Sequence, residues 1–346
     1  MTDMFSGTYR RGIFVQRETR IAVAAVLVVV ILAGTSYYIY WNQNQGRDML
    51  VISTTTSLYD TGLLDVIKER YEQENPNVIL AFISAGTGIA ITHAKNGDAD
   101  MILVHSPSQE YSFMNESYGV NRKIFAYNYF TIVGPSSDVA EINQTDPISA
   151  LQMIYNYGHA HNTSLWITRD DFSGTNSKEI SLWGAAGYNY TQLRDEPWFV
   201  SSGVGMASTL NIANEQSLYT LSDIGTYVKY KSDELISLDQ LVGEGQELLN
   251  VYSAIVVNNT TVSFAKFDLA MDFLQWIVGL TAQQLIADYG VADYGQGLFF
   301  PVVDMLESES PTQIFGWIRE YAFFNDGEDL YECPPGWRFG EYGLYG

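Results

Sequence analysis

The stretch "MLVISTTTSLYDTGLLDVIKERYEQENPNVILAFIS", residues 49–84, sets the pattern for most of the chain. Short apolar runs at 49–54 and 78–84 have the composition of buried strands, and 63–75 has apolar residues at helical spacing. A strand, a helix and a second strand in this order are typical of a largely parallel sheet covered by helices. The sequence therefore predicts an α/β fold.

The same alternation continues beyond this stretch. The further elements that we expect are helices at 88–97, at 146–157, after Gly174 and at 263–287, and strands at 99–106, 122–135, 164–168, 223–232 and 248–258. Two strands, "FTIVGP" (130–135) and "NVYSAIVVN" (250–258), are candidates for crossing between two lobes. Ligands of such folds bind between the lobes, at the carboxyl ends of the strands.

Composition and charge exclude several classes of function. The chain has 346 residues and a formal net charge of −22, and its 18 Lys and Arg residues form no cluster that could track nucleic acid. Cys333 is the only cysteine, which excludes an intrachain disulfide. Motifs of hydrolases, zinc proteases and nucleotide-binding proteins are absent from the sequence. We expect a binding protein rather than an enzyme, with no cofactor and no metal.

The run "IAVAAVLVVVILAGTSYYIYW", residues 21–41, has no charged residue and is long enough to cross a bilayer of about 30 Å as a helix. Four arginines in 1–20 precede it, which predicts a cytoplasmic N-terminus, a transmembrane anchor at 21–41 and an exported remainder after the linker 42–48. A cleaved signal peptide is the alternative interpretation.

Three strand-to-helix junctions carry hydroxyls and glycines: "TTTS" (54–57), "AGTG" (85–88) and "FSGT" (172–175). The start of a helix leaves N–H groups unpaired and carries about half a positive charge, so it binds anions without a cationic side chain. Arg169 adds one full charge, on a planar group suited to two oxygens. Three such turns at equivalent places in a two-lobe topology favour a shared oxyanion pocket.

Several ordered segments, including "TTTSLYDTGLLDVI", "RDDFSGTNSKEISLW", "MASTLNIANEQSLYTLSDIGTY" and "YGQGLFFP", resemble the tungstate-binding proteins of ABC uptake transporters. The resemblance runs along most of 50–301. It implies a type II periplasmic-binding-protein fold with a ligand cleft between two lobes. In this interpretation 49–134 and 251–301 form the first lobe, 135–250 forms the second, and 302–346 is a C-terminal tail.

The resemblance implies capture of a tetrahedral oxyanion, tungstate or possibly molybdate, and its delivery to an ABC permease in the membrane. The residues that match the binding residues of the family are Thr54, Thr55 and Ser57 in the first loop, Gly86 and Thr87 in the second, Arg169, Ser173, Gly174 and Thr175 in the third, and Ser208, Thr209, Asn211, Tyr219 and Thr220 on the closing side of the second lobe. Two alternatives stay open: a binder of another oxyanion such as phosphate, and an anchored sensory domain on the same fold.

The chain departs from the family at Asp170, Phe172 and Asn176, where Gly, Asp or Asn, and His are usual. We expect Asp170 to face solvent, because a carboxylate beside Arg169 would weaken binding. Asp171 either orients Arg169 or caps the following helix. Tungstate and molybdate are fully deprotonated near pH 7 and need donors only, whereas a site for phosphate profits from a carboxylate acceptor.

Overall fold

The computed structural model describes residues 46–243, 245–309, 312–327, 329–340 and 343–345. The predicted anchor at 21–41 lies outside these ranges. No helix within them combines the length and the apolar character needed to cross a bilayer.

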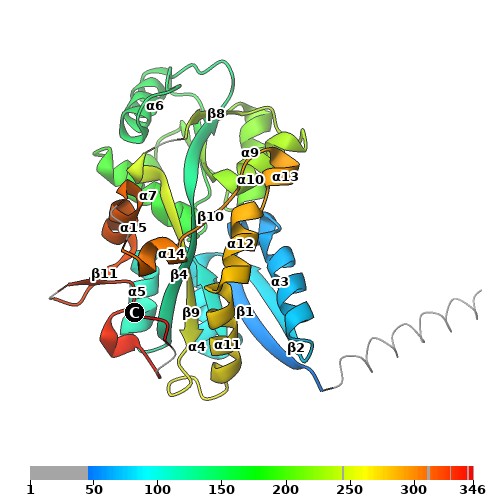
Figure 1. Ribbon diagram of the computed structural model, residues 1–346. Coiled ribbons are helices and arrows are strands. Elements are labelled where there is room, and N and C mark those ends of the chain that lie inside the picture. The colour runs from blue at the N-terminus through cyan, green and yellow to red at the C-terminus, as the bar shows by residue number, and fades with distance from the viewer. Residues whose placement is uncertain (1–45, 244, 310–311, 328, 341–342, 346) are drawn as a thin grey trace, which may run out of the picture. The chain divides into compact units, whose positions relative to one another are not determined.

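The main sheet has the strand order β10-β4-β9-β3-β1-β2 (Figure 1). Its strands are β1 (Asp48–Thr55), β2 (Val78–Ala85), β3 (Met101–Val104), β4 (Gly119–Gly134), β9 (Leu249–Val257) and β10 (Phe300–Pro301). β1 pairs with β3 in parallel, whereas β9 is antiparallel to β3 and β4. The helices of this first lobe are α2 (Thr56–Asp60), α3 (Leu63–Glu74), α4 (Thr87–Asn96), α5 (Pro107–Asn115), α11 (Phe267–Ile277) and α12 (Leu280–Asp288).

A second lobe forms on the far end of β4. Residues 119–129 of β4 pair with β9, and residues 130–134 pair instead with β7 (Thr220–Asp223) and β8 (Asp239–Val242). β5 (Trp166–Thr168) and β6 (Phe199–Ser201) form a separate parallel pair. The helices here are α6 (Pro147–His161), α7 (Gly174–Ala185), α8 (Tyr190–Leu193), α9 (Met206–Gln216) and α10 (Ile224–Ser232). The α/β prediction is therefore confirmed.

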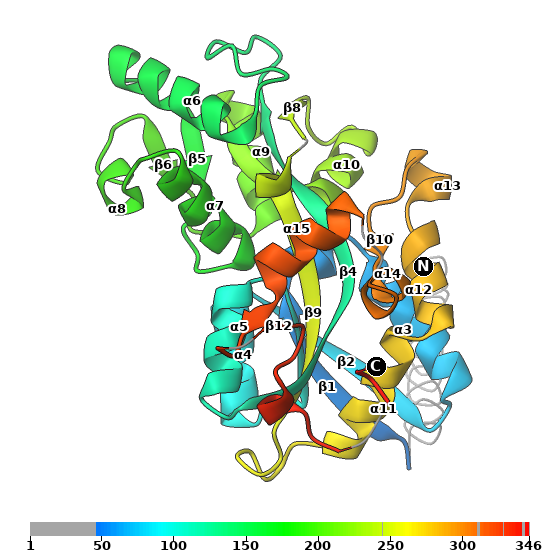
Figure 2. The ribbon, with the colours of Figure 1, turned by 60° about the vertical axis from the view of Figure 1, so that its left-hand side comes forward.

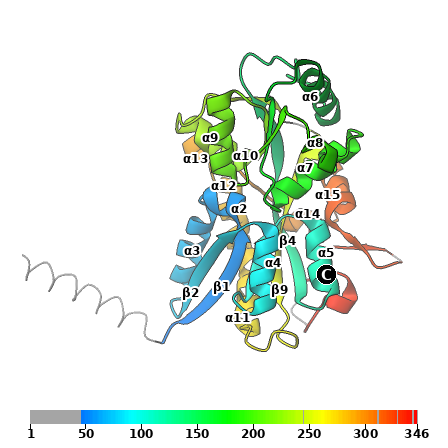
Figure 3. The same cartoon turned by 180° about the vertical axis from the view of Figure 1, so that it is seen from behind.

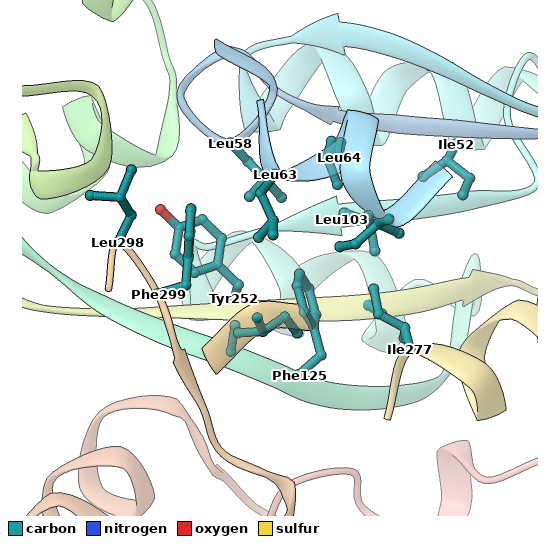
Figure 4. Close-up of a cluster of buried hydrophobic side chains, with 14 of the residues drawn as sticks. Ile52, Leu58, Leu63, Leu64, Leu103, Phe125, Tyr252, Ile277, Leu298 and Phe299 are labelled. Atoms are coloured by element: carbon teal, nitrogen blue, oxygen red, sulfur yellow. The ribbon is translucent and has the colours of Figure 1, made fainter. Parts of the chain in front are cut away.

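The first lobe has an apolar core that continues into the second lobe through Met206, Leu210 and Tyr227. In the first lobe, Leu63, Leu64 and Ile67 on α3 pack with Leu103 and Phe125 of the sheet (Figure 4). The spacing of these leucines and isoleucine puts them on one face of α3, and full burial of such a side chain contributes about 1.5–3 kcal/mol. The second core is aromatic and is built around Trp166, Trp183 and Trp198, all fully buried.

Two predictions of secondary structure were wrong. Residues 224–232 form a helix, α10, rather than a strand, because Asp223 accepts hydrogen bonds from the backbone and hydroxyl of Thr226 and so caps a helix start. The predicted helix at 263–287 is two helices, α11 and α12, separated at Val278 and Gly279. The other strands and helices that we expected are present, with ends that differ by a few residues.

The tail forms ordered structure that the sequence did not reveal. It contains α14 (Val303–Glu307), α15 (Gln313–Ala322) and the two-stranded ladder of β11 (Phe324–Asn325) and β12 (Leu330–Tyr331). Glu332 accepts hydrogen bonds from Lys123 Nζ at 2.6 Å and from the backbone N–H of Ile124 at 2.5 Å. The tail is therefore attached to β4 by a nearly buried ion pair, and α15 lies between α5 and α7 (Figure 2).

Candidate anion-binding site

The three predicted junctions meet where the lobes touch. Thr55 caps α2, Gly86 precedes α4 and Ser173 caps α7. An ideal Cβ built on Gly86 would lie 3.5 Å from Ser173 Cα, so the starts of α4 and α7 are in contact. Arg169 Nη2 donates to Thr56 Oγ1 at 3.0 Å, which joins the second lobe to the start of α2. Donors from both lobes therefore lie around one point.

Arg169 is 1% exposed and is held rigidly. Its Nε and Nη2 donate to Asp171 Oδ2 at 3.1 and 2.5 Å, and Nη1 lies 3.4 Å from Thr175 Oγ1. The other oxygen of Asp171 accepts from the backbone N–H of Ser173 at 3.2 Å. Asp171 thus orients Arg169, one of the two roles that we expected, whereas the cap of α7 is Ser173. A guanidinium oriented in this way needs no rearrangement before it meets an anion.

A buried network behind the first junction determines what Ser57 can donate. Asn250 Nδ2 donates to Asn128 Oδ1 at 2.9 Å, so Asn250 Oδ1 accepts from His105 Nδ1 at 2.8 Å. Burial lowers the pKa of His105 to about 4, which leaves the imidazole neutral, and its Nε2 then accepts the Ser57 hydroxyl at 3.2 Å. The Ser57 hydroxyl proton is therefore used within the protein, and the backbone N–H is the donor that remains.

Two other hydroxyls at the junctions differ from that of Ser57. Thr54 Oγ1, at the end of β1, and Thr87 Oγ1, in the first turn of α4, are buried without a hydrogen bond to any residue that the structure describes. An unpaired buried hydroxyl costs about 1–3 kcal/mol, so a protein retains one only for a reason. The cap position Gly86 has no side chain to occupy the first N–H groups of α4. The two hydroxyls and these amides are donors available to a ligand.

The position of Gly174 has no room for a side chain, because His105 lies against it. A Cβ on Gly174 would lie 2.7 Å from the Cε1 atom of His105, closer than atoms can approach. Only glycine lets the start of α7 approach the first lobe so closely.

The predicted residues on α9 are placed differently from the junctions. Ser208 and Asn211 are exposed, and Thr209 Oγ1 is hydrogen-bonded to Ser202 Oγ and to the carbonyl of Gly205. The amino end of α9 is closer to the site, because a Cβ on Gly205 would lie 3.9 Å from Thr56 Oγ1. Figure 3 shows α2 directly beside α9 and α10. The structure thus brings the start of α9, rather than these three side chains, toward Arg169.

Tyr219 and Thr220 are buried, and their hydroxyls form hydrogen bonds within the protein. The Tyr219 hydroxyl donates to Asp138 Oδ1 at 2.9 Å and accepts from the backbone N–H of Ala140. Thr220 Oγ1 donates to the carbonyl of Ile167 at 2.7 Å. Both hydroxyls hold the second lobe together, and their predicted contact with a ligand stays a prediction.

Asp170 does not face solvent as we expected. Its side chain is 14% exposed and pairs with Arg194 Nη2 at 2.9 Å and with Ser201 Oγ at 3.0 Å. The exposed Arg194 offsets the charge of Asp170, so this carboxylate is compensated by pairing rather than by solvent. Phe172, in contrast, is 81% exposed.

Glu179 lies behind Arg169 and adds little negative charge. Its oxygens lie 2.7 Å from Trp166 Nε1 and 2.6 Å from Thr168 Oγ1. Burial raises the pKa of Glu179 to about 8, so most of it is protonated at pH 7. Two further carboxylates, Asp60 and Asp223, interact with Arg169 through space, and burial raises the pKa of both.

Sequence reasoning missed Thr56, His105 and Asn250. Thr56 stands inside the quoted "TTTS" and could have been named with its neighbours. His105 follows a predicted strand, but its partner Asn250 is 145 residues away, and no local pattern links the two.

Two α/β lobes that share a long strand, with donors from both lobes around one buried guanidinium, define a two-lobe anion-binding protein. A family model described as a PBP superfamily domain matches residues 41–279. The tungstate-binding protein TupA of Peptoclostridium acidaminophilum is 34% identical over 262 residues, which are 75% of this chain and 87% of that protein. The chain belongs to the PBP superfamily and, within it, to the family of the TupA proteins.

Solved structures agree with this assignment. The tungstate-binding protein TupA from Desulfovibrio alaskensis superposes with a TM-score of 0.62 at 34% identity, covering 73% of this chain and 98% of that one. A structure described as the tungstate ABC transporter from Geobacter sulfurreducens also has a TM-score of 0.62, at 36% identity, covering 70% of this chain and 98% of that one.

Proposed function

We propose that this chain is the substrate-binding protein of an ABC importer, and that it captures tungstate between its lobes and delivers it to the permease. The observation that carries the proposal is the pair of buried hydroxyls of Thr54 and Thr87, which lack partners among the described residues and stand at two of the three junctions that meet near Arg169. A tetrahedral oxyanion supplies the acceptors that these donors lack.

The carboxylate nearest to Arg169 favours a ligand without a proton. Asp171 uses one oxygen for Arg169 and the other for Ser173, so it has no oxygen assigned to a ligand proton. Phosphate keeps a proton part of the time near pH 7 and would profit from such an acceptor. Tungstate and molybdate carry no proton there, and the names of the relatives favour tungstate.

The arrangement in the cell is part of the proposal. The run 21–41 anchors the protein as a single transmembrane helix, with 1–20 inside and the binding lobes outside. Residues 49–134 and 251–301 form the first lobe and 135–250 the second. The protein acts by binding and release and is not an enzyme.

Isothermal titration of the purified full-length protein with tungstate, molybdate, sulfate and phosphate tests the proposal. We expect saturable one-to-one binding of tungstate and molybdate, with phosphate at least tenfold weaker. Arg169→Ala should abolish most of the affinity, because the desolvated guanidinium is the one full positive charge among the donors described above. Arg70→Ala is the matched control, since Arg70 is half-exposed and pairs with Glu74 on the surface of α3, away from the junctions. Absence of heat with tungstate and molybdate would refute the function.

A further inference from the structure

A cavity lies beside the proposed oxyanion site. It has a volume of about 190 Å³, is partly open to solvent, and is lined by residues at the start of α5 in the first lobe, in α7 of the second and in α15 of the tail. The polar residues that line it are Ser106, Ser108, Ser177, Lys178, Ser181 and Tyr321. Gly174 is the residue that it shares with the junctions above. The described lining contains donors and no carboxylate.

Lys178 is the unusual member of this lining. It is 6% exposed, and it forms no hydrogen bond or ion pair with any residue in the described ranges. Its Nζ lies 4.0 Å from the ring centre of Tyr321 and 6.0 Å from that of Phe130. A ring face attracts an ammonium group but accepts no conventional hydrogen bond from it, so the N–H donors of Lys178 remain available to the cavity that it lines. Burial accordingly lowers the pKa of Lys178 to about 7.

The carboxylates near Lys178 do not accept hydrogen bonds from its ammonium group. Glu110 is fully buried and uses one oxygen for the backbone N–H of Ser106 and the other for Arg122 Nε at 2.8 Å. Glu247 and Glu320 line an adjoining cavity, which shares Lys178, Ser181 and Tyr321 with the first. Glu247 favours the charged lysine through space, but no ion pair joins them. The ammonium group therefore has hydrogen bonds to donate, and no oxygen of the residues that the structure describes accepts one.

The remaining lining supplies further donors. Ser177 Oγ accepts from Gln109 Nε2 at 2.8 Å, which leaves its own proton available. Ser106 is the N-cap of the nine-residue helix α5 and makes no side-chain cap there. Burial raises the pKa of Tyr321, so its hydroxyl stays protonated and can donate. Hydroxyls, a helix start and an ammonium group around one space form a donor set for an anion.

We propose that this cavity is a second anion site, that Lys178 is its counter-cation, and that its ligand is a small inorganic anion such as chloride or sulfate. The volume accommodates one such ion together with a few waters, since a water occupies about 30 Å³. Because the lining comes from both lobes and from the tail, the bound ion links α5, α7 and α15. The site is distinct from the oxyanion site at Arg169 and does not depend on which oxyanion binds there.

Chloride-35 NMR line width on the full-length Arg169→Ala protein tests the second site without interference from the first. We expect saturable broadening that sulfate reverses, that Lys178→Met removes and that Lys178→Arg largely keeps. Lys95→Met is the matched control, because Lys95 is paired with Glu116 at the surface and its loss should leave the broadening unchanged. Equal broadening in Lys178→Met, or none in the Arg169→Ala parent, would overturn the proposal.

A second measurement covers the case in which Lys178→Met does not fold. Crystals of the unaltered protein soaked in bromide should show an anomalous peak within about 3.5 Å of Lys178 Nζ, the distance range of a polar contact. Absence of that peak overturns the second site and leaves the tungstate titration untouched. Conversely, a protein that binds bromide here and ignores tungstate refutes the proposed function alone.

Discussion

Replacing Thr54 or Thr87 by valine tests whether the hydroxyl of that residue binds a ligand or stabilises the fold. Valine keeps nearly the same shape and removes the hydroxyl. In the ligand-free protein each hydroxyl is buried and unpaired among the described residues, and such a group costs about 1–3 kcal/mol. We therefore expect either variant to leave the free energy of unfolding unchanged or to raise it by up to that amount.

Binding should change in the opposite direction. A hydrogen bond to a charged group contributes about 1.5–3 kcal/mol, and 1.4 kcal/mol corresponds to a factor of ten in affinity. Each valine should therefore weaken tungstate binding by about ten- to a hundredfold. Titration calorimetry measures the affinity, and urea unfolding without oxyanion measures the stability.

Thr131→Val is the matched control. Thr131 is equally buried, but its hydroxyl donates to the carbonyl of Val242 at 2.8 Å. That variant should lose about 1 kcal/mol of stability and keep its affinity. If Thr54→Val and Thr87→Val bind tungstate like the parent, or lose stability as Thr131→Val does, their hydroxyls serve the protein and the reasoning fails.

Three further predictions concern stability. Glu332→Gln should lower the free energy of unfolding by about 3 kcal/mol, because it leaves Lys123 buried without its partner; an unchanged urea midpoint would contradict this. His105 has a pKa of about 4 in the folded protein against an ordinary value of 6.5. Its contribution to the free energy of unfolding is therefore complete above pH 6.5 and falls by up to about 3 kcal/mol toward pH 4. Urea unfolding of the parent should show this loss relative to His105→Gln. Glu179 has a pKa of about 8 in the folded protein against 4.5, so its contribution to stability falls as the pH rises. The free energy of unfolding of Glu179→Gln should therefore increase relative to that of the parent by roughly 1 kcal/mol per pH unit between 4.5 and 8. Parallel pH curves for the two proteins would exclude this effect.

The fold could be predicted from the sequence because its signals are local. The apolar face of α3 and the two runs beside it are visible within 49–84, and they are sufficient to specify a parallel α/β unit. The error at 223–232 has the same origin, since tyrosines and lysines alternate there while the cap that decides for a helix is a contact between Asp223 and Thr226. Short polar contacts outweighed the apparent period of two.

The site was only partly predictable, because its decisive contacts join distant parts of the chain. The junction residues could be named from strand-turn-helix patterns, and they do come together. His105 accepts the hydrogen bond from Ser57 because Asn250 and Asn128 fix the other side of its ring. No spacing in the sequence links these residues. The tail shows the same limit, since its attachment uses Glu332 and Lys123, 209 residues apart.

The continuity of β4 determines how the protein can open. Residues 119–129 of β4 belong to the sheet of one lobe and residues 130–134 to that of the other, with no loop between them. A change in the angle between the lobes must then be spread as extra twist along an extended, paired backbone, instead of being absorbed by a few freely rotating residues. We therefore expect substitutions around Tyr129 and Phe130 to alter how long an anion is retained, although neither residue is among the donors of the site.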